Sequence, residues 1–113
     1  MDGRLPAHLE ISALIRQVEV EGGFAVVVRK GEREAGTILV ILTENGQNSR
    51  AYERMPQLDG TRSWHCAIRR DPENIEDFSD YLERRGTQDP DLWIVELDIA
   101  HGERFIELPL END

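Results

Sequence analysis

The chain of 113 residues is long enough for one domain with a modest core, and its single cysteine, Cys66, excludes an internal disulfide and a multi-cysteine zinc site. The net charge is −10, and residues 57–113, with 6 basic and 15 acidic residues, contribute −9, which disfavours binding to nucleic acid and to anionic membranes. No apolar segment approaches the ~20 residues of a membrane span, so we expect a soluble, cytoplasmic protein.

The first predicted element is an amphipathic helix from about Ser12 to Glu21. Leu14 and Val18 lie at helical spacing on one stripe, and Ser12 is a favourable N-cap residue. Gly22 and Gly23 follow as a C-terminal stop signal. The preceding residues 8–11 are expected to form a short strand or to remain irregular.

Two apolar, β-branched runs follow, Phe24–Val28 and Ile38–Leu42. Neither run alternates with polar residues, which is typical of strands that are buried on both faces. The connector Lys30–Ala35 is short, so the pattern predicts an antiparallel hairpin. We expect this hairpin to lie at the centre of a sheet.

The turn Asn45-Gly46 leads to a third predicted strand, Ser49–Met55. Its many charged residues predict a more exposed position. A fourth strand is predicted over Arg62–Ile68, with Cys66 on its inner side.

Asp71-Pro72 predicts the start of a second helix, because Asp is a good N-cap and Pro suits the first helical position. Gly86 is expected to end it. A strand over Leu92–Ile99 and a short last strand over Arg104–Leu108 complete the chain.

The predicted order is α-β-β-β-β-α-β-β, and every connection between consecutive strands is short. This pattern favours a single α+β domain over residues 1–113, with a mainly antiparallel sheet of five to six strands and two helices.

No motif predicts a catalytic or metal site. His65 and Cys66 are adjacent on a strand and therefore point to opposite faces, which disfavours a catalytic pair. His8, His65 and His101 lack the spacing of metal ligands. We therefore predict no catalytic residue, no metal and no cofactor.

The strongest functional hint is the second face of the predicted sheet. Two helices are too few to cover both faces, and an uncovered apolar face usually marks a partner surface. The leading hypothesis is a small non-enzymatic protein-interaction module that forms a homodimer through this face. The residues expected there, opposite Val26, Val40 and Val95, are Ala25, Val27, Leu39, Ile41, Leu92 and Ile94.

The alternative hypothesis is a small-ligand-binding protein or an enzyme. Its site would lie near the break before the fifth strand, where Asp89, Asp91 and Trp93 could meet His8 or His101. Such a site requires a pocket that the sequence does not reveal.

The chain also resembles a known family, the domain of unknown function 1491, through an ordered string of short blocks. The resemblance covers nearly the whole chain and implies a bacterial cytoplasmic protein of the kind typical of alphaproteobacteria. It implies no activity. The blocks that carry it are Arg4–Leu9, Ser12–Arg16, Gly22–Ala25, Arg29–Gly31, Glu34–Gly36 and Asp89–Trp93.

Overall fold

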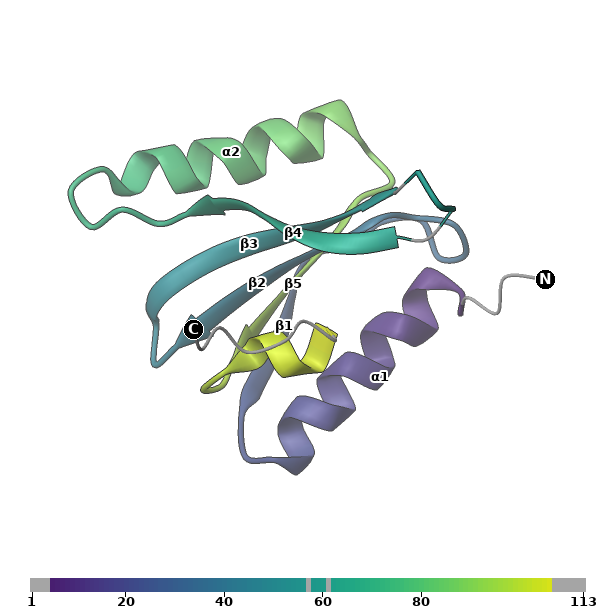
Figure 1. Cartoon of the computed structure of the whole chain (residues 1–113), viewed down its shortest axis with the longest axis horizontal. Coiled ribbons are helices and arrows are strands. Elements are labelled where there is room, and N and C mark those ends of the chain that lie inside the picture. The colour runs from purple at the N-terminus through teal and green to yellow at the C-terminus, as the bar shows by residue number, and fades with distance from the viewer. Residues whose placement is uncertain (1–4, 57, 61, 107–113) are drawn as a thin grey trace.

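The computed structural model describes residues 5–56, 58–60 and 62–106, and its order of elements confirms the predicted α+β class (Figure 1). Two helices flank a five-stranded sheet, and a short 3-10 helix follows the last strand. The elements are α1 (Ala7–Val20), β1 (Phe24–Arg29), β2 (Ile38–Glu44), β3 (Gln47–Pro56), β4 (Arg62–Arg69), α2 (Ile75–Gln88), β5 (Trp93–Asp98) and the 3-10 helix η1 (Gly102–Ile106).

The strands are ordered β1-β5-β2-β3-β4, and the sheet is mixed. Three neighbouring pairs are antiparallel, whereas β2 and β5 run parallel in a register that sets Val40 beside Val95. The prediction of a central β1–β2 hairpin is therefore wrong, because β5 lies between these two strands. Strand β2 is central and buried on both faces, as its sequence indicates, but β1 forms an edge.

The connector from β1 to β2 steps over the start of β5 instead of making a hairpin turn. Its backbone bonds to that segment: Glu32 N–H donates to the Asp91 carbonyl (3.0 Å), and Trp93 Nε1 donates to the Glu32 carbonyl (2.7 Å). A Cβ on Gly31 would sit 2.1 Å from the Asp91 carbonyl oxygen, so only glycine permits this approach. This contact holds β5 between β1 and β2.

Each face of the sheet has its own helix and its own core (Figure 1). The α1 face buries Val18, Val40 and Val95, among others, and η1 packs beside α1 there. The α2 face buries Leu39, Phe78 and other apolar residues. The prediction of which β1 residues share a face with Leu39 was also wrong. Residues 25 and 27 pack on the α1 side, because β5, and not β2, sets the register of β1.

Helix α1 begins earlier than predicted, at Ala7, so the expectation of a short strand over residues 8–11 was wrong. Pro6 precedes the helix, where its fixed φ and missing N–H are tolerated. The first free N–H groups find partners in the β1–β2 connector: Ala7 donates to the Glu34 carbonyl and His8 to the Arg33 carbonyl. A tertiary contact thus replaces a side-chain cap, which sequence reading alone does not detect.

Strand β3 is an inner strand and not an exposed one, with Arg50, Ala51 and Tyr52 buried. Strand β4 forms the second edge. A bulge at Ala67 shifts its register, so that Ile68 packs on the α2 core. Cys66 lies opposite Tyr52 but is exposed, contrary to prediction.

Two boundaries near the C-terminal half also differ from prediction. Helix α2 starts at Ile75 after a turn closed by an Asp71–Asn74 bridge, and it runs through Gly86 to Gln88. Where a sixth strand was expected over residues 104–108, the chain forms η1 as far as Ile106, and the remainder of that prediction lies outside the described residues.

Candidate functional site

The break before β5 holds the first group of residues proposed for a ligand site. Asp89 accepts hydrogen bonds from the Thr37 hydroxyl (2.8 Å) and from the Asp91 N–H (3.1 Å). Trp93 is buried and donates its indole N–H to the connector. These polar groups are engaged in holding the connector and the start of β5 together.

His8 lies at the same end of the molecule, but its ring is also engaged. Its Nδ1 donates to the Arg33 carbonyl (3.0 Å), and its Nε2 accepts from the Arg33 guanidinium (3.2 Å). His101 lies beyond the opposite end of β5, where its backbone N–H donates to Glu44 (3.2 Å). The structure therefore gathers His8, Asp91 and Trp93 around one connector and leaves His101 far from them.

A cavity of about 350 Å³ opens between the start of α1 and the sheet. None of the five residues proposed for a ligand site lines it. Its lining consists of Leu5, Pro6, Ala7, Glu10, Glu34, Ala35, Gly36, Arg54 and Arg62. Glu10 and Arg54 form an ion pair (2.5 Å) inside it, and the Arg54 guanidinium stacks 4.8 Å from the Trp64 ring centre, so the charges of Glu10 and Arg54 are already paired.

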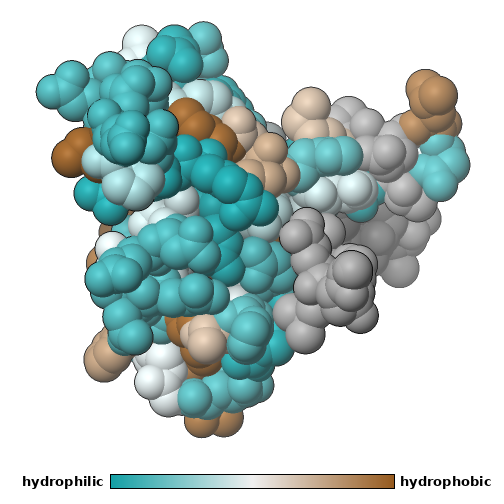
Figure 2. Space-filling view, turned by 60° about the vertical axis from the view of Figure 1, so that its left-hand side comes forward, coloured by the Kyte–Doolittle hydropathy of each residue, from teal (hydrophilic) through white to brown (hydrophobic). Residues whose placement is uncertain are grey.

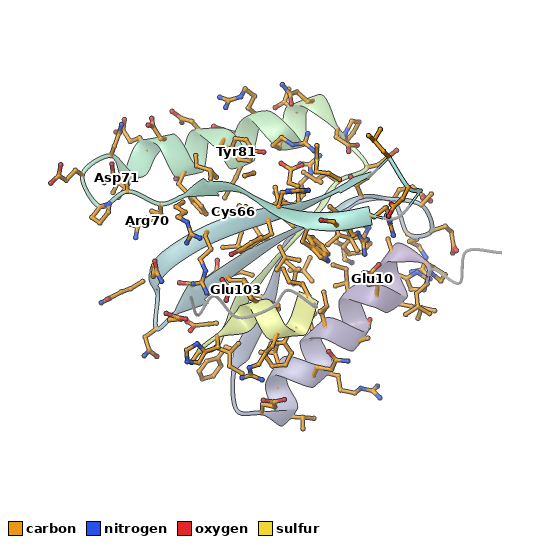
Figure 3. All side chains as sticks on the ribbon, in the orientation of Figure 1. Glu10, Cys66, Arg70, Asp71, Tyr81 and Glu103 are labelled. Atoms are coloured by element: carbon orange, nitrogen blue, oxygen red, sulfur yellow. The ribbon has the colours of Figure 1, made fainter. Side chains whose placement is uncertain are left out.

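A buried ionic cluster ties η1 to β3. Arg50 and Tyr52 both donate to Glu103, each at 2.9 Å (Figure 3). Burial alone would raise the pKa of the Glu103 carboxyl, but these two hydrogen bonds outweigh it and lower the pKa to about 2. The carboxylate is thus held ionised and fully engaged, which suits a structural tether better than an acid or a base.

A similar cluster lies on the α2 side of the sheet (Figure 3), where Arg85 and Tyr81 both donate to Glu53. Burial and the hydrogen bond to Glu53 raise the pKa of Tyr81 to about 12. The same donors lower the pKa of Glu53 despite its burial. This cluster anchors α2 to β3 and offers no group with a pKa suited to proton transfer near neutral pH.

In the part of the chain that the structure describes, no group of three or more His, Cys, Asp or Glu side chains is placed to bind a metal ion. Neither of the described helices is long and apolar enough to cross a membrane.

The surface feature that stands out is the outer side of β1. Phe24, Val26 and Val28 are 75%, 54% and 51% exposed, and we call these three residues the β1 strip. On the face shown in Figure 2, hydrophobic residues appear in small separate groups among hydrophilic ones. Three exposed apolar side chains are thus aligned on one edge strand of the sheet.

The sequence analysis missed the β1 strip because it placed Phe24–Val28 in the middle of the sheet. One signal could have revealed it. The stretch between β1 and β2 runs from Lys30 to Thr37, which is long for a tight hairpin and sufficient to step over one strand. The glycines at both sides of that stretch, Gly31 and Gly36, each approach the Asp91 carbonyl oxygen and mark the crossing point.

Comparisons with known proteins agree with this fold. A crystal structure of a DUF1491 family protein from Caulobacter crescentus CB15 is 35% identical and matches with a TM-score of 0.81, over 96% of this chain and 100% of that one. An NMR structure of a DUF1491 family protein from the same organism matches with a TM-score of 0.77 at 35% identity, over 96% of this chain and 97% of that one. The solution structure of protein Atu0922 from A. tumefaciens matches with a TM-score of 0.74 at 29% identity, over 96% of this chain and 99% of that one.

Among curated proteins, none matches the chain. The family described as "Protein of unknown function (DUF1491)" matches residues 5–107, almost the entire length. With this match and the shared fold, the chain belongs to the DUF1491 family.

Proposed function

We propose that this protein is a small, non-enzymatic, cytoplasmic interaction module that forms a homodimer, with the β1 strip inside the contact surface. The observation that carries the proposal is the exposure of Phe24, Val26 and Val28 on an edge strand. Edge strands of monomeric proteins usually carry charges, prolines or a covering segment that prevent pairing with another chain. The first five residues of β1, Phe24–Val28, contain no charge and no proline.

A non-enzymatic role is supported by the way the charged groups are used. Glu103 and Glu53 are each held by an arginine and a tyrosine, and Glu10 is paired with Arg54. A general acid or base needs a free group near a substrate pocket. These three carboxylates are committed to contacts inside the fold.

The alternative of a ligand site at the break before β5 has less support. Asp89 and Trp93 are bound to the connector, and His8 is bound to Arg33. The cavity of about 350 Å³ nearby is lined by other residues. A ligand there would first have to replace hydrogen bonds that hold the fold together.

Light scattering coupled to size-exclusion chromatography tests the homodimer. Between about 1 and about 200 μM, the weight-average mass should rise from the 13.0 kDa of one chain towards twice that value, as expected of a micromolar complex. A lysine in place of Val26 should weaken association at least roughly tenfold, because a symmetric contact through the β1 strip would bring the two introduced positive charges together. Ala67→Lys on the exposed outer edge strand β4 is the matched control and should leave the mass curve unchanged.

A wild-type mass of 13.0 kDa throughout this range would reject the homodimer. Equal weakening by Val26→Lys and Ala67→Lys would show that the β1 strip is not the contact surface. Far-UV circular dichroism on each variant checks that both retain the fold.

A further inference from the structure

We infer that two copies of this chain join edge to edge by antiparallel pairing of their β1 strands about a twofold axis at Val26, an inference that rests on the proposed homodimer and specifies its geometry. The result would be one continuous sheet of ten strands, five from each copy. Strand β1 uses one side of its backbone to pair with β5. No other strand of the described residues pairs with its other side, so the N–H and C=O groups there can pair with a second copy.

The twofold symmetry of such a pair fixes which residues can face each other. In an antiparallel pair, residues directly opposite each other have side chains on the same face of the sheet. If a twofold axis normal to the sheet relates the two strands, it must therefore pass beside one residue, which then lies opposite its own copy. The apolar run Phe24–Val28 has Val26 at its midpoint, and its pairing with β5 is regular over residues 24–27, before the register shift at Val28. An axis there sets Phe24 opposite the second copy's Val28 and pairs every apolar residue of the run with another.

The charges at the two ends of β1 favour this antiparallel arrangement. Glu19 and Glu21 precede the strand, whereas Arg29 and Lys30 end it. Antiparallel pairing brings the exposed Lys30 of one copy towards the acidic end of the other, across Gly22 and Gly23, which have no side chains to obstruct it. Glu21 also accepts from Arg104 of its own chain (2.6 Å), but it remains 49% exposed and open to a second cation.

Packing of the two β1 strips face to face is less favourable. Glu96 lies beside Val26, and Asp98 lies beside Phe24, on neighbouring strand β5. Face-to-face packing would bury these carboxylates of both copies in one interface, at a large desolvation cost. In edge pairing, the two Glu96 residues are three strand spacings apart, roughly 14 Å, which exceeds the Debye length of about 8 Å at physiological salt.

The arrangement also closes on itself. Each copy uses its β1 edge in a contact with the same edge of the other copy, so no apolar edge is left to add a third chain. The outer ends of the ten-stranded sheet would both be β4, whose exposed residues include Arg62 and Arg69. We therefore expect a discrete dimer and not a fibre.

Disulfide crosslinking between single cysteines, introduced into a Cys66→Ser chain, tests which residues of the two β1 strands lie opposite each other. With Val26→Cys, the two thiols lie directly opposite, with Cα atoms about 5 Å apart, within the range of a disulfide. With Phe24→Cys, the two thiols lie about four residues apart along the strands, roughly 14 Å, which is too far. Mild oxidation should therefore crosslink the Val26→Cys chain at least about tenfold faster than the Phe24→Cys chain.

A mixture of Phe24→Cys and Val28→Cys chains sharpens the test, because these positions face each other and should give a mixed disulfide dimer. Ala67→Cys on β4 is the control for random collision and should crosslink slowly. Light scattering on the Cys66→Ser chain runs in parallel.

The outcomes are distinguishable. Preferential crosslinking at position 26 supports the inference. Crosslinking at position 24 as fast as at position 26, with a doubled mass retained, would overturn edge pairing about Val26 and leave the homodimer standing. A monomeric mass would overturn both.

Discussion

Strands β1 and β4 form the two ends of one sheet, but their exposed side chains differ in kind. On β1 the exposed residues are the three apolar side chains of the β1 strip. On β4 they include Arg62, His65 and Arg69. Each of the two strands has one register shift, at Val28 in β1 and at Ala67 in β4, so the difference between them lies in their side chains. Charged side chains are a usual means by which an edge strand resists pairing. Strand β4 is therefore protected against pairing with another chain, as in a monomer, whereas β1 has the composition of an inner strand.

The difference also explains why sequence analysis misplaced β1. Its residues have the composition of a buried strand, and the only described strand paired with it is β5. A second copy on its outer side would give β1 a neighbour on each edge, as its sequence suggests.

The largest effect is expected from breaking the contact that makes β1 an edge. Gly31→Val would place a side chain 2.1 Å from the Asp91 carbonyl oxygen and push the connector off the start of β5. We expect the free energy of unfolding to fall by about 3–5 kcal/mol, as for other severe backbone clashes. Urea denaturation measures this, with Glu34→Ala, an exposed side chain in the same connector, as the control expected to change it by less than about 0.5 kcal/mol. A change of similar size in both variants would contradict the role assigned to Gly31.

A smaller effect concerns the half of the sheet that ends in β4, where Glu103 ties η1 to β3. The pKa of its carboxyl is about 2 in the folded protein, below its ordinary value in an unfolded chain. Its stabilisation is therefore complete above the ordinary pKa and is lost as pH falls from about 4 towards 2. Glu103→Gln should lower the free energy of unfolding by about 1–3 kcal/mol at neutral pH and by much less near pH 2.

Denaturation of both proteins across this pH range checks the prediction, and a difference that stays constant with pH would contradict it. The mass curve of Glu103→Gln at neutral pH should match that of the wild type, because the β1 edge carries no part of this cluster.

The smallest effect is expected from the charge at the end of β1. Lys30→Glu would oppose the acidic end of the second copy and should weaken association by about threefold to tenfold, typical of an exposed charge pair. Arg70→Glu, just after β4, makes the same change in net charge at the other edge. Equal weakening by the two variants would indicate general repulsion between acidic chains and not a contact at Lys30.

The sequence predicted which segments form helices and strands better than it predicted which strands lie next to each other in the sheet. The runs around Val26, Val40 and Val95 each form a strand, and the α+β order is confirmed. Period and composition report how buried a strand is but not which strand lies next to it. The position of β5 depends on the approach of Gly31 to Asp91, a contact across 60 residues that no local pattern encodes.

The exposed apolar surface was also expected from the sequence, but its position in the fold was predicted wrongly. The expectation of an apolar surface came from counting helices, yet α1 and α2 cover opposite faces of the sheet. The exposed surface arises instead from the edge position of β1. Cys66 was misplaced for a related reason, because β4 is an edge strand and the Cys66 side chain is exposed there although its strand partner Tyr52 is buried.

Backbone amide hydrogen exchange, followed by NMR in dilute and concentrated solutions, tests the contrast between the two edges most directly. We expect exchange in β1, over Phe24–Val28, to slow at least about tenfold between about 5 and about 500 μM, while exchange in β4, over Arg62–Arg69, stays the same. Exchange in β1 that is independent of concentration, or protection that appears in β4 instead, would contradict it.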